Sequence, residues 1–216
     1  FLISDTERLA AGLEDICITN TNRQAHALQD TIGQAKVSAM AHRIKLINPD
    51  CIVNEIEDFV IADNVSQYLT HSMDIVIDAT DSIPAKAAMI AYCKRNKINI
   101  ITIGGAGGQI DPRLVTSGDL AKTIQDPLAA KLRSELRRQY NFSKNPKRRF
   151  GIECIYSTEQ LRYPQGDGTV GKQKLSGEGA VKLDCETGFG ASVAVTGTFG
   201  FVAVAQAINK FLKQRA

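Results

Sequence analysis

The sequence contains no C-x-x-C pair. Its five cysteines stand singly and far apart, at Cys17, Cys51, Cys93, Cys154 and Cys185. This absence excludes a four-cysteine zinc site and a thioredoxin-type redox motif. Because scattered single cysteines are typical of a reducing compartment, we expect a cytoplasmic protein.

Other patterns are also missing. The chain has no internal repeat and no low-complexity tract, and its composition excludes a fibrous repeat or a disulfide-stapled miniprotein. The opening Phe1-Leu2-Ile3 is too short for a signal peptide, and acidic residues follow it at once. The first residue is not methionine, so we expect the native beginning of the protein to lie upstream.

The composition is that of an ordinary globular protein. The 216 residues are 44% hydrophobic and 23% charged, and this length favours one large α/β domain over residues 1–216. The 26 basic and 23 acidic residues give a net charge of +3. An excess this small does not identify a partner, so the position of the charges matters more than their sum.

The first half of the chain alternates strand-like with helix-like segments. We expect strands over residues 15–19, 51–56, 74–80 and 98–103, and helices over residues 33–47 and 85–96. This alternation predicts a Rossmann-like, doubly wound and mostly parallel sheet. In such sheets, ligands bind at the carboxyl ends of the strands.

The second half predicts a basic helix over residues 120–140, a loop over 141–149, a strand over 151–158 and a long, mobile crossover loop over 163–186. No charged residue occurs from Gly188 to Ile208, and this run is long enough to span a bilayer. Its many small residues favour a close-packed terminal helix buried in protein. Membrane association of residues 188–208 is the alternative.

Polar residues follow the predicted strands where a nucleotide could bind. A hydroxyl, two amides and the Arg23 guanidinium follow the first strand, where they could hold a phosphate or simply form a polar turn that caps the next helix. Asp81 follows a buried strand, where it could bind magnesium or cap a helix. A single lysine on a helix is usually a solvated surface residue. The candidates are Asn20, Asn22, Arg23, Gln24, Lys36 and Asp81.

Basic residues are concentrated in one segment, opposed there only by Glu135. Such a segment suits an RNA backbone, and a solvated amphipathic helix with a basic loop explains it equally well. Few aromatic residues are interleaved, so base stacking has little support. The candidate nucleic-acid-binding residues are Lys131, Arg133, Arg137, Arg138, Lys144, Lys147, Arg148 and Arg149.

Together the motifs are more specific than any one of them. The chain carries D-x-x-x-T-N-x-N-R-Q from Asp15, G-x-x-K ending at Lys36, and D-A-T-D-S from Asp78. This pattern resembles the ubiquitin-activating-type adenylating enzymes, the superfamily of ThiF and MoeB. Within it, residues 19–28, 103–112, 119–128, 163–169 and the glycine-rich end from 184 resemble the tRNA threonylcarbamoyladenosine dehydratases.

The resemblance covers nearly the whole chain and implies an activity. Asn20, Asn22, Arg23 and Gln24 would hold the phosphates of ATP with Lys36, and Asp81 would bind Mg²⁺. The enzyme would adenylate the carboxylate of threonylcarbamoyladenosine beside the tRNA anticodon, and the ring would then close with release of AMP. Arg23 and Asp81 would be the catalytic residues. A homodimer is also implied.

No protein nucleophile is needed for this reaction, so Cys154 and Cys185 are interpreted first as buried or loop cysteines.

One departure from the superfamily pattern is clear. Its members open with a strand, a G-x-G-G-x-G loop and a helix, and residues 1–12 are too short for that unit. Gly12 stands where an acid would hold the ribose. We therefore expect a domain of about 250–270 residues whose N-terminal nucleotide-binding unit is missing from this sequence. Otherwise the protein is truncated and cannot bind ATP. Arg8 is a candidate for an arginine that reaches into a neighbouring subunit's site.

Two other functions are weighed against this one. A non-catalytic module of the same fold could bind a sulfur-transfer protein partner. A nicotinamide oxidoreductase is disfavoured because the glycines at 104–108 have the wrong spacing and follow a late strand.

Overall fold

The computed structural model describes residues 2–3, 7–12, 14–165, 167–172 and 190–215. Seven strands form one sheet in the order β3-β2-β1-β4-β5-β7-β6. The strands are β1 (Leu2–Ile3), β2 (Glu7–Ala11), β3 (Ile52–Ile56), β4 (Ile75–Asp78), β5 (Ile100–Ile103), β6 (Val115–Asp119) and β7 (Glu153–Ser157).

The sheet is mostly parallel, as predicted. The pairs β2–β3, β4–β5 and β5–β7 are parallel, and β1 pairs antiparallel with both β2 and β4. The strands β2, β3, β4, β5 and β7 therefore point in one direction. The short β1 and the edge strand β6 run against them. Consequently the carboxyl ends of five strands meet at one edge of the sheet.

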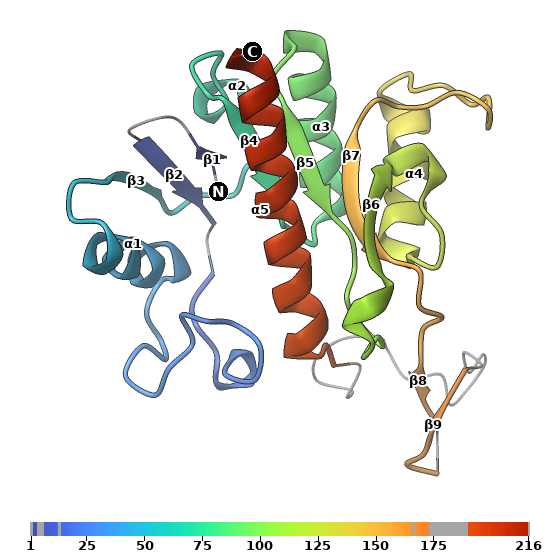
Figure 1. The fold of residues 1–216 in the computed structure, drawn as a ribbon, viewed down its shortest axis with the longest axis horizontal. Helices are drawn as coiled ribbons and strands as arrows, with labels where there is room; N and C mark the ends of the chain where they lie inside the picture. Colours follow the sequence, from blue (N-terminus) through green and yellow to red (C-terminus); the bar gives the residue numbers. More distant parts are fainter. Residues whose placement is uncertain (1, 4–6, 13, 166, 173–189, 216) are drawn as a thin grey trace.

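Helices cover both faces of the sheet. The five helices among the described residues are α1 (Lys36–Ile47), α2 (Val65–Tyr68), α3 (Ile83–Asn96), α4 (Pro127–Gln139) and α5 (Val193–Arg215). Figure 1 shows α5 crossing one face of the sheet while α3 and α4 lie on the other. This is the doubly wound arrangement expected from the sequence.

The alternation of side chains along the strands explains why both faces are covered. Val76, Ile100 and Cys154 point into the core beneath α2, α3 and α4. Their neighbours Ile101 and Ile155 point to the opposite face, where they pack against the inner side of α5. Because the central strands are apolar on both faces, they are stable only between two layers of helices.

The predicted strand over residues 15–19 is wrong. Only Asp15 makes a bridge, to Ala35, and a 3₁₀ turn follows at Ile18–Asn20. The side chain of Asn20 accepts a hydrogen bond from the Cys17 N–H at 3.1 Å, and the Asn20 N–H donates to the Cys17 carbonyl at 2.9 Å. Local turn bonds thus replace the ladder bonds that a strand would need.

The predicted helices over 33–47 and 120–140 both begin later than expected. Gly33 has φ of +83° and Ala35 is extended, so α1 begins at Lys36. Residues 120–122 form a 3₁₀ turn, and α4 begins at Pro127 because Asp126 caps it. Proline is favoured at a first helical position, where its missing N–H costs nothing.

The predicted loop over 163–186 is wrong in its first part. The strands β8 (Tyr163–Pro164) and β9 (Val170–Gly171) pair there as a hairpin. Residues 173–186, with Cys185, lie outside the described residues.

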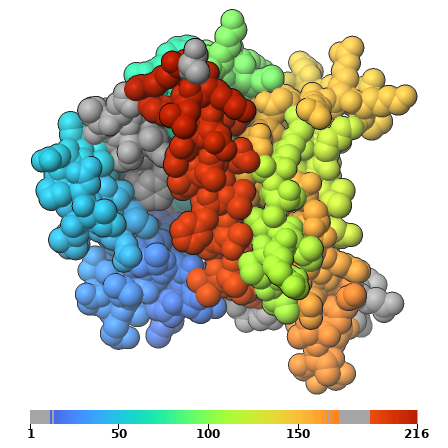
Figure 2. Space-filling model, in the orientation of Figure 1, coloured from blue at the N-terminus to red at the C-terminus, as the bar shows by residue number. Residues whose placement is uncertain are grey.

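The terminal helix is not buried as predicted. Val195, Phe199, Ala203 and Ala207 face the sheet. On its other side Phe201 is 80% exposed, and Figure 2 shows α5 along the surface of the molecule. The small residues are therefore spread along a helix that packs on one side only.

Candidate functional site

Three segments that follow parallel strands meet at the carboxyl edge of the sheet. Residues 14–35 follow β2, residues 79–82 follow β4, and residues 104–109 follow β5. Figure 1 shows the first of these segments at the same end of the molecule as the β8–β9 hairpin and the start of α5. This is the edge at which doubly wound sheets bind ligands.

The segment 14–35 is folded back against the start of α1. The Ile16 N–H donates to the Gln34 carbonyl at 2.9 Å, and the Gly33 N–H donates to the Ile16 carbonyl at 2.9 Å. Ile16 itself is buried with Ala27 and Ala39 in a small apolar cluster. The fold thereby packs the segment that carries the polar residues 20–24 against α1.

Arg23 is held by its neighbours in this segment. Its Nη1 donates to the Thr19 carbonyl at 2.7 Å and to Asn22 Oδ1 at 2.9 Å. Asn20 is buried and its side-chain oxygen is engaged in the 3₁₀ turn. Asn20 therefore stabilises the turn from inside, whereas the side chains of Asn22 and Arg23 reach the protein surface.

Two buried polar atoms beside Arg23 have no hydrogen-bond partner. They are Oε1 of Gln24 and Nε2 of His26. Burial lowers the pKa of His26 below its usual range, and the positive charges of Lys36 and Arg43 lower it further. Since buried polar groups are normally satisfied, these atoms indicate a site that accommodates a polar ligand.

Lys36 begins α1 and pairs with Glu14. The ammonium contacts the Glu14 carboxylate, and the Lys36 N–H donates to the Glu14 carbonyl at 2.9 Å. The lysine side chain is 22% exposed and the glutamate 55%. An anionic ligand would therefore have to share the lysine with Glu14.

Asp81 lies just after β4 and is exposed. Among the described residues, no hydrogen bond or ion pair joins it to the Arg23 segment. Beneath it, Asp78 Oδ1 accepts a hydrogen bond from the Thr80 N–H at 3.1 Å, and the Thr80 hydroxyl accepts one from the Ser82 N–H at 3.3 Å. The loop that carries Asp81 is therefore built on a buried carboxylate.

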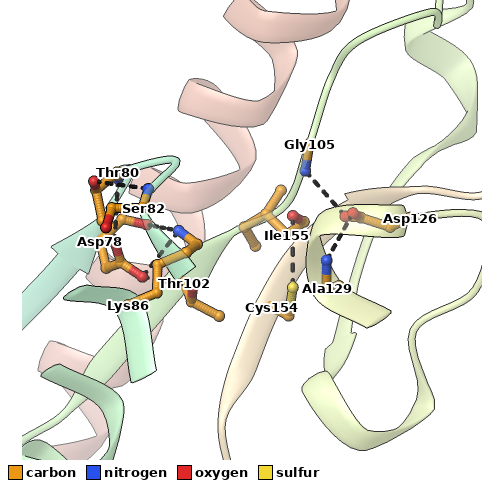
Figure 3. A network of polar contacts seen from close by, with 10 residues as sticks. All are labelled: Asp78, Thr80, Ser82, Lys86, Thr102, Gly105, Asp126, Ala129, Cys154 and Ile155. Carbon is orange, nitrogen blue, oxygen red and sulfur yellow. Dashed lines mark hydrogen bonds and ion pairs between the residues drawn. The ribbon is translucent and has the colours of Figure 1, made fainter. Parts of the chain in front are cut away.

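The other oxygen of this carboxylate is paired inside the protein (Figure 3). Asp78 Oδ2 lies 2.9 Å from Lys86 Nζ and accepts a hydrogen bond from Thr102 Oγ1 at 2.7 Å. Lys86 is only 1% exposed. Our sequence reasoning missed this ion pair. The available signal was that Lys86 is the one charged residue in the apolar run 83–93.

A second buried carboxylate at this edge was also missed. Asp126 Oδ2 accepts a hydrogen bond from the Gly105 N–H at 3.0 Å, and Oδ1 accepts one from the Ala129 N–H at 2.9 Å. Burial raises the pKa of Asp126, and the backbone hydrogen bonds and the charge of Lys86 oppose that rise. Figure 3 shows Asp126 joining the loop after β5 to the first turn of α4.

The predicted basic segment comprises α4 and the loop that follows it, and its side chains differ in exposure. Arg133 is half-buried and donates to the Thr123 hydroxyl near the start of α4. Arg137 stacks on the Phe150 ring, with 5.3 Å between its guanidinium carbon and the ring centroid. The residues Lys144, Lys147, Arg148 and Arg149 are exposed in the loop that leads into β7, and Lys131 and Arg138 are exposed on α4. That loop lies at the amino edge of the sheet, opposite Asp81.

The described cysteines do not form a reactive centre. Cys93 and Cys154 are buried, and burial raises the pKa of Cys93 to about 12 and that of Cys154 further still. Cys17 is exposed and Cys51 is half-buried. Cys154 is thus a buried core cysteine, as expected.

Comparison with known protein families identifies the family of this chain. The model of the ThiF family matches residues 13–215. The chain belongs to the ThiF family. The resemblance found in the sequence motifs is therefore confirmed.

Curated relatives agree with this assignment. The chain is 55% identical over 204 residues to the tRNA threonylcarbamoyladenosine dehydratase of Escherichia coli (strain K12), covering 94% of this chain and 76% of that protein. It is 52% identical, with the same coverage, to the protein of that name from Haemophilus influenzae. The similarity to these relatives therefore covers nearly the whole chain and is not confined to the motifs around Arg23, Lys36 and Asp81.

Solved structures share the fold. A structure titled TcdA (CsdL) superposes with a TM-score of 0.86 at 52% identity, covering 97% of this chain and 78% of that one. The E. coli tRNA N6-threonylcarbamoyladenosine dehydratase in complex with ATP gives a TM-score of 0.83 at 48% identity, covering 97% and 76%. The fold is therefore that of an ATP-binding relative.

Proposed function

We propose that this protein is an ATP-dependent enzyme that dehydrates threonylcarbamoyladenosine in tRNA to a cyclic product. The observation that carries the proposal is the 55% identity over 94% of the chain to a dehydratase of this name. The position of Arg23, Lys36 and Asp81 at one edge of the sheet supports it. A cytoplasmic location fits a tRNA substrate.

ATP fits the residues beside α1. Arg23 and Lys36 supply positive charge for the phosphates, and the unpaired Gln24 oxygen and His26 nitrogen provide polar groups for the nucleotide. Charge-assisted hydrogen bonds from these cations would orient the phosphates and stabilise the charge that develops on them.

Mg²⁺ fits Asp81. This exposed carboxylate is a suitable single ligand, and the described residues hold no cluster of three or more His, Cys, Asp or Glu. Mg²⁺ commonly binds one or two carboxylates together with phosphate oxygens and water. When bound, the ion would neutralise phosphate charge at the point of reaction.

The chemistry follows from the weakness of a carboxylate as an electrophile. Transfer of AMP to the carboxylate of the threonylcarbamoyl group makes a mixed anhydride and releases pyrophosphate. The neighbouring carbamoyl group then attacks the activated carbonyl, AMP leaves and the ring closes, so the nucleoside loses one water overall. Holding these two groups together accelerates the closure, and no protein nucleophile is required.

The tRNA would contact the basic residues of α4 and the following loop. The exposed loop cations Lys144, Lys147, Arg148 and Arg149 suit a phosphate backbone, and binding through them would weaken as salt is added. They lie a full strand length from Asp81, a separation that a folded tRNA is large enough to span.

We further propose that two copies associate through the outer side of α5. The exposed apolar residues Phe201, Val204, Ile208 and Leu212 form a stripe at helical spacing.

Two other contacts are less well supported. By length and composition α5 could cross a membrane, but this is weak evidence for a membrane span because the core helices of soluble proteins pass the same test. A sulfur-transfer partner would need an accessible thiol, and Cys17 is the exposed one among the described cysteines.

The activity is tested with the full-length protein, Mg²⁺, ATP and tRNA that carries threonylcarbamoyladenosine. We expect release of AMP and formation of the dehydrated nucleoside, detected by mass spectrometry. Arg23→Ala and Asp81→Ala should each lower turnover by about 100-fold or more.

Lys45→Ala is the matched control, because it removes an exposed cation from the last turn of α1, on the other side of the molecule from α4 and the basic loop (Figure 1). Its turnover should equal that of the wild type. Absence of AMP release by the wild-type protein would refute the proposed function, and normal turnover of Arg23→Ala or Asp81→Ala would refute the assigned roles.

A further inference from the structure

A polar cavity of about 280 Å³ lies between the start of α4 and the chain that follows β7. We call it the Arg133 pocket. It is set apart from the Arg23 and Lys36 residues along the same carboxyl edge of the sheet. Its polar and aromatic lining consists of Gln125, Asp126, Arg133, Gln160, Tyr163 and Lys172.

Arg133 is a charged group in the wall of this pocket that makes no ion pair with another described residue. Its Nη1 donates to the Thr123 hydroxyl, and no carboxylate in the described part of the chain lies within ion-pair distance of it. The residue is half-buried. A guanidinium has five N–H donors, so most of them remain available to an anionic ligand.

Asp126 lies in the same wall, but its carboxylate is already used. Its two oxygens accept the Gly105 and Ala129 N–H groups. A Cβ added at Gly104 would come within 2.0 Å of Asp126 Oδ2, so the backbone at Gly104 approaches the carboxylate as only glycine can. Asp126 therefore forms a fixed part of the wall, and its oxygens are hydrogen-bonded to the backbone rather than to Arg133.

Lys172 brings a second positive charge from a separate element. It follows β9 in the β8–β9 hairpin, which is closed by a 2.8 Å hydrogen bond from the Gln165 N–H to the Thr169 carbonyl. The lysine is exposed and lines the cavity. With one carboxylate and two cations, the pocket carries a net positive charge.

We propose that the Arg133 pocket binds an anionic oxygen group of the substrate nucleotide. This inference rests on the proposed function. The group is either the carboxylate of the threonylcarbamoyl arm or the phosphate beside it, because a guanidinium matches both in shape and charge. The cavity is too small for an RNA helix and suits one small polar group, with the amides of Gln125 and Gln160 as further hydrogen-bonding partners.

The test measures the Kd of the full-length protein for tRNA with and without threonylcarbamoyladenosine. We expect Arg133→Met and Lys172→Met each to raise the Kd for modified tRNA by about tenfold, the loss of a hydrogen bond to a charged group. Lys45→Met, which removes an exposed lysine on α1 outside the pocket and away from the basic loop, should change it less than twofold.

The unmodified tRNA distinguishes the two sources of the anion. If the pocket binds the carboxylate, Arg133→Met leaves the affinity for unmodified tRNA unchanged. If it binds the phosphate, affinity for both tRNAs falls and the slope of log K against log salt decreases by about one. Pocket variants that bind both tRNAs as tightly as Lys45→Met would overturn the proposal.

Two further measurements keep the result interpretable. Lys172→Met changes an exposed residue on a hairpin, so it tests the pocket even where Arg133→Met disturbs α4. Binding of ATP alone should be unchanged in both variants. A wild-type protein that binds modified tRNA through the pocket but releases no AMP would refute the proposed function and leave the pocket assigned.

Discussion

Lys86 and Asp78 are both nearly inaccessible to solvent, and each depends on the other. The side chains lie 2.9 Å apart with 1% and 0% exposure, and Thr102 donates a further hydrogen bond to the same carboxylate. A buried ion pair of this kind adds little net stability, but removing one partner leaves an uncompensated charge. The pair also supports the backbone of the loop that carries Asp81.

Lys86→Met should therefore destabilise the fold by about 3–5 kcal/mol, because Asp78 loses its counter-ion in a buried site. The double variant Asp78→Asn with Lys86→Met should lose much less than the sum of the single variants, since no isolated charge remains. Urea unfolding followed by circular dichroism measures all three free energies. Strict additivity would contradict the coupling of the two residues.

At the scale of one element, α4 shows how a helix start is fixed by a single side chain. Asp126 caps the helix through the Ala129 N–H and at the same time holds Gly105, while Pro127 supplies the first helical residue. Its carboxylate is buried, and burial raises its pKa. Burial of Asp126 therefore favours its protonated form in the folded state, although the backbone hydrogen bonds of the cap favour the carboxylate.

This predicts a pH dependence whose sign is fixed. With a folded-state pKa above the unfolded value of about 3.9, the folded state binds more protons, so Asp126 lowers stability as pH rises through that interval. Asn caps helices about as well as Asp. The unfolding free energy of Asp126→Asn relative to wild type should therefore increase from pH 4 to pH 7 in urea titrations. A constant difference across this range would refute the prediction.

Elements with strong local patterns could be predicted from sequence, and those set by distant contacts could not. The apolar runs of β4 and β5 and the helices α1 and α3 were found close to their observed bounds, because burial on both faces leaves a clear pattern. The apolar pattern of residues 15–19 predicts a strand, but the hydrogen bond from the Cys17 N–H to Asn20 stabilises a turn there instead.

In the candidate site too, the motif residues could be predicted from the sequence and the long-range contacts could not. Arg23, Lys36 and Asp81 follow recognisable motifs, so their common edge could be inferred from the direction of the strands. The Asp78 and Lys86 pair joins residues on a strand and a helix, and Asp126 reaches Gly105 across 21 positions. No periodic pattern encodes such contacts, since each depends on the packed arrangement of several elements.

At the scale of the whole molecule, the outer side of α5 leaves a stripe of apolar side chains exposed. Its inner side packs on the sheet with Val195, Phe199 and Ala203, while Phe201 and Leu212 are exposed. Figure 2 shows the helix along the surface of the molecule. An exposed apolar stripe of this kind is typical of a surface to which a partner binds. The proposed homodimer would cover it.

Phe201→Asp should therefore raise the dimer dissociation constant by at least tenfold, because it places a charge in a desolvated interface. Light scattering coupled to size-exclusion chromatography over a concentration series measures the change. Gln67→Asp on α2 adds the same charge to an exposed position elsewhere and should leave the mass unchanged. A wild-type protein that is monomeric throughout would refute the dimer.

The position of the basic loop at the amino edge has a consequence for how the protein can change over evolution. Residues 141–149 join α4 to β7 and contact neither the Arg23 segment nor the Asp81 loop by any hydrogen bond or ion pair in the described chain. Choice of RNA and chemistry on the nucleotide would then be encoded by separate parts of the sequence. The loop could drift, lengthen or exchange its charges and so shift the preferred tRNAs, while the catalytic edge remains under unchanged selection.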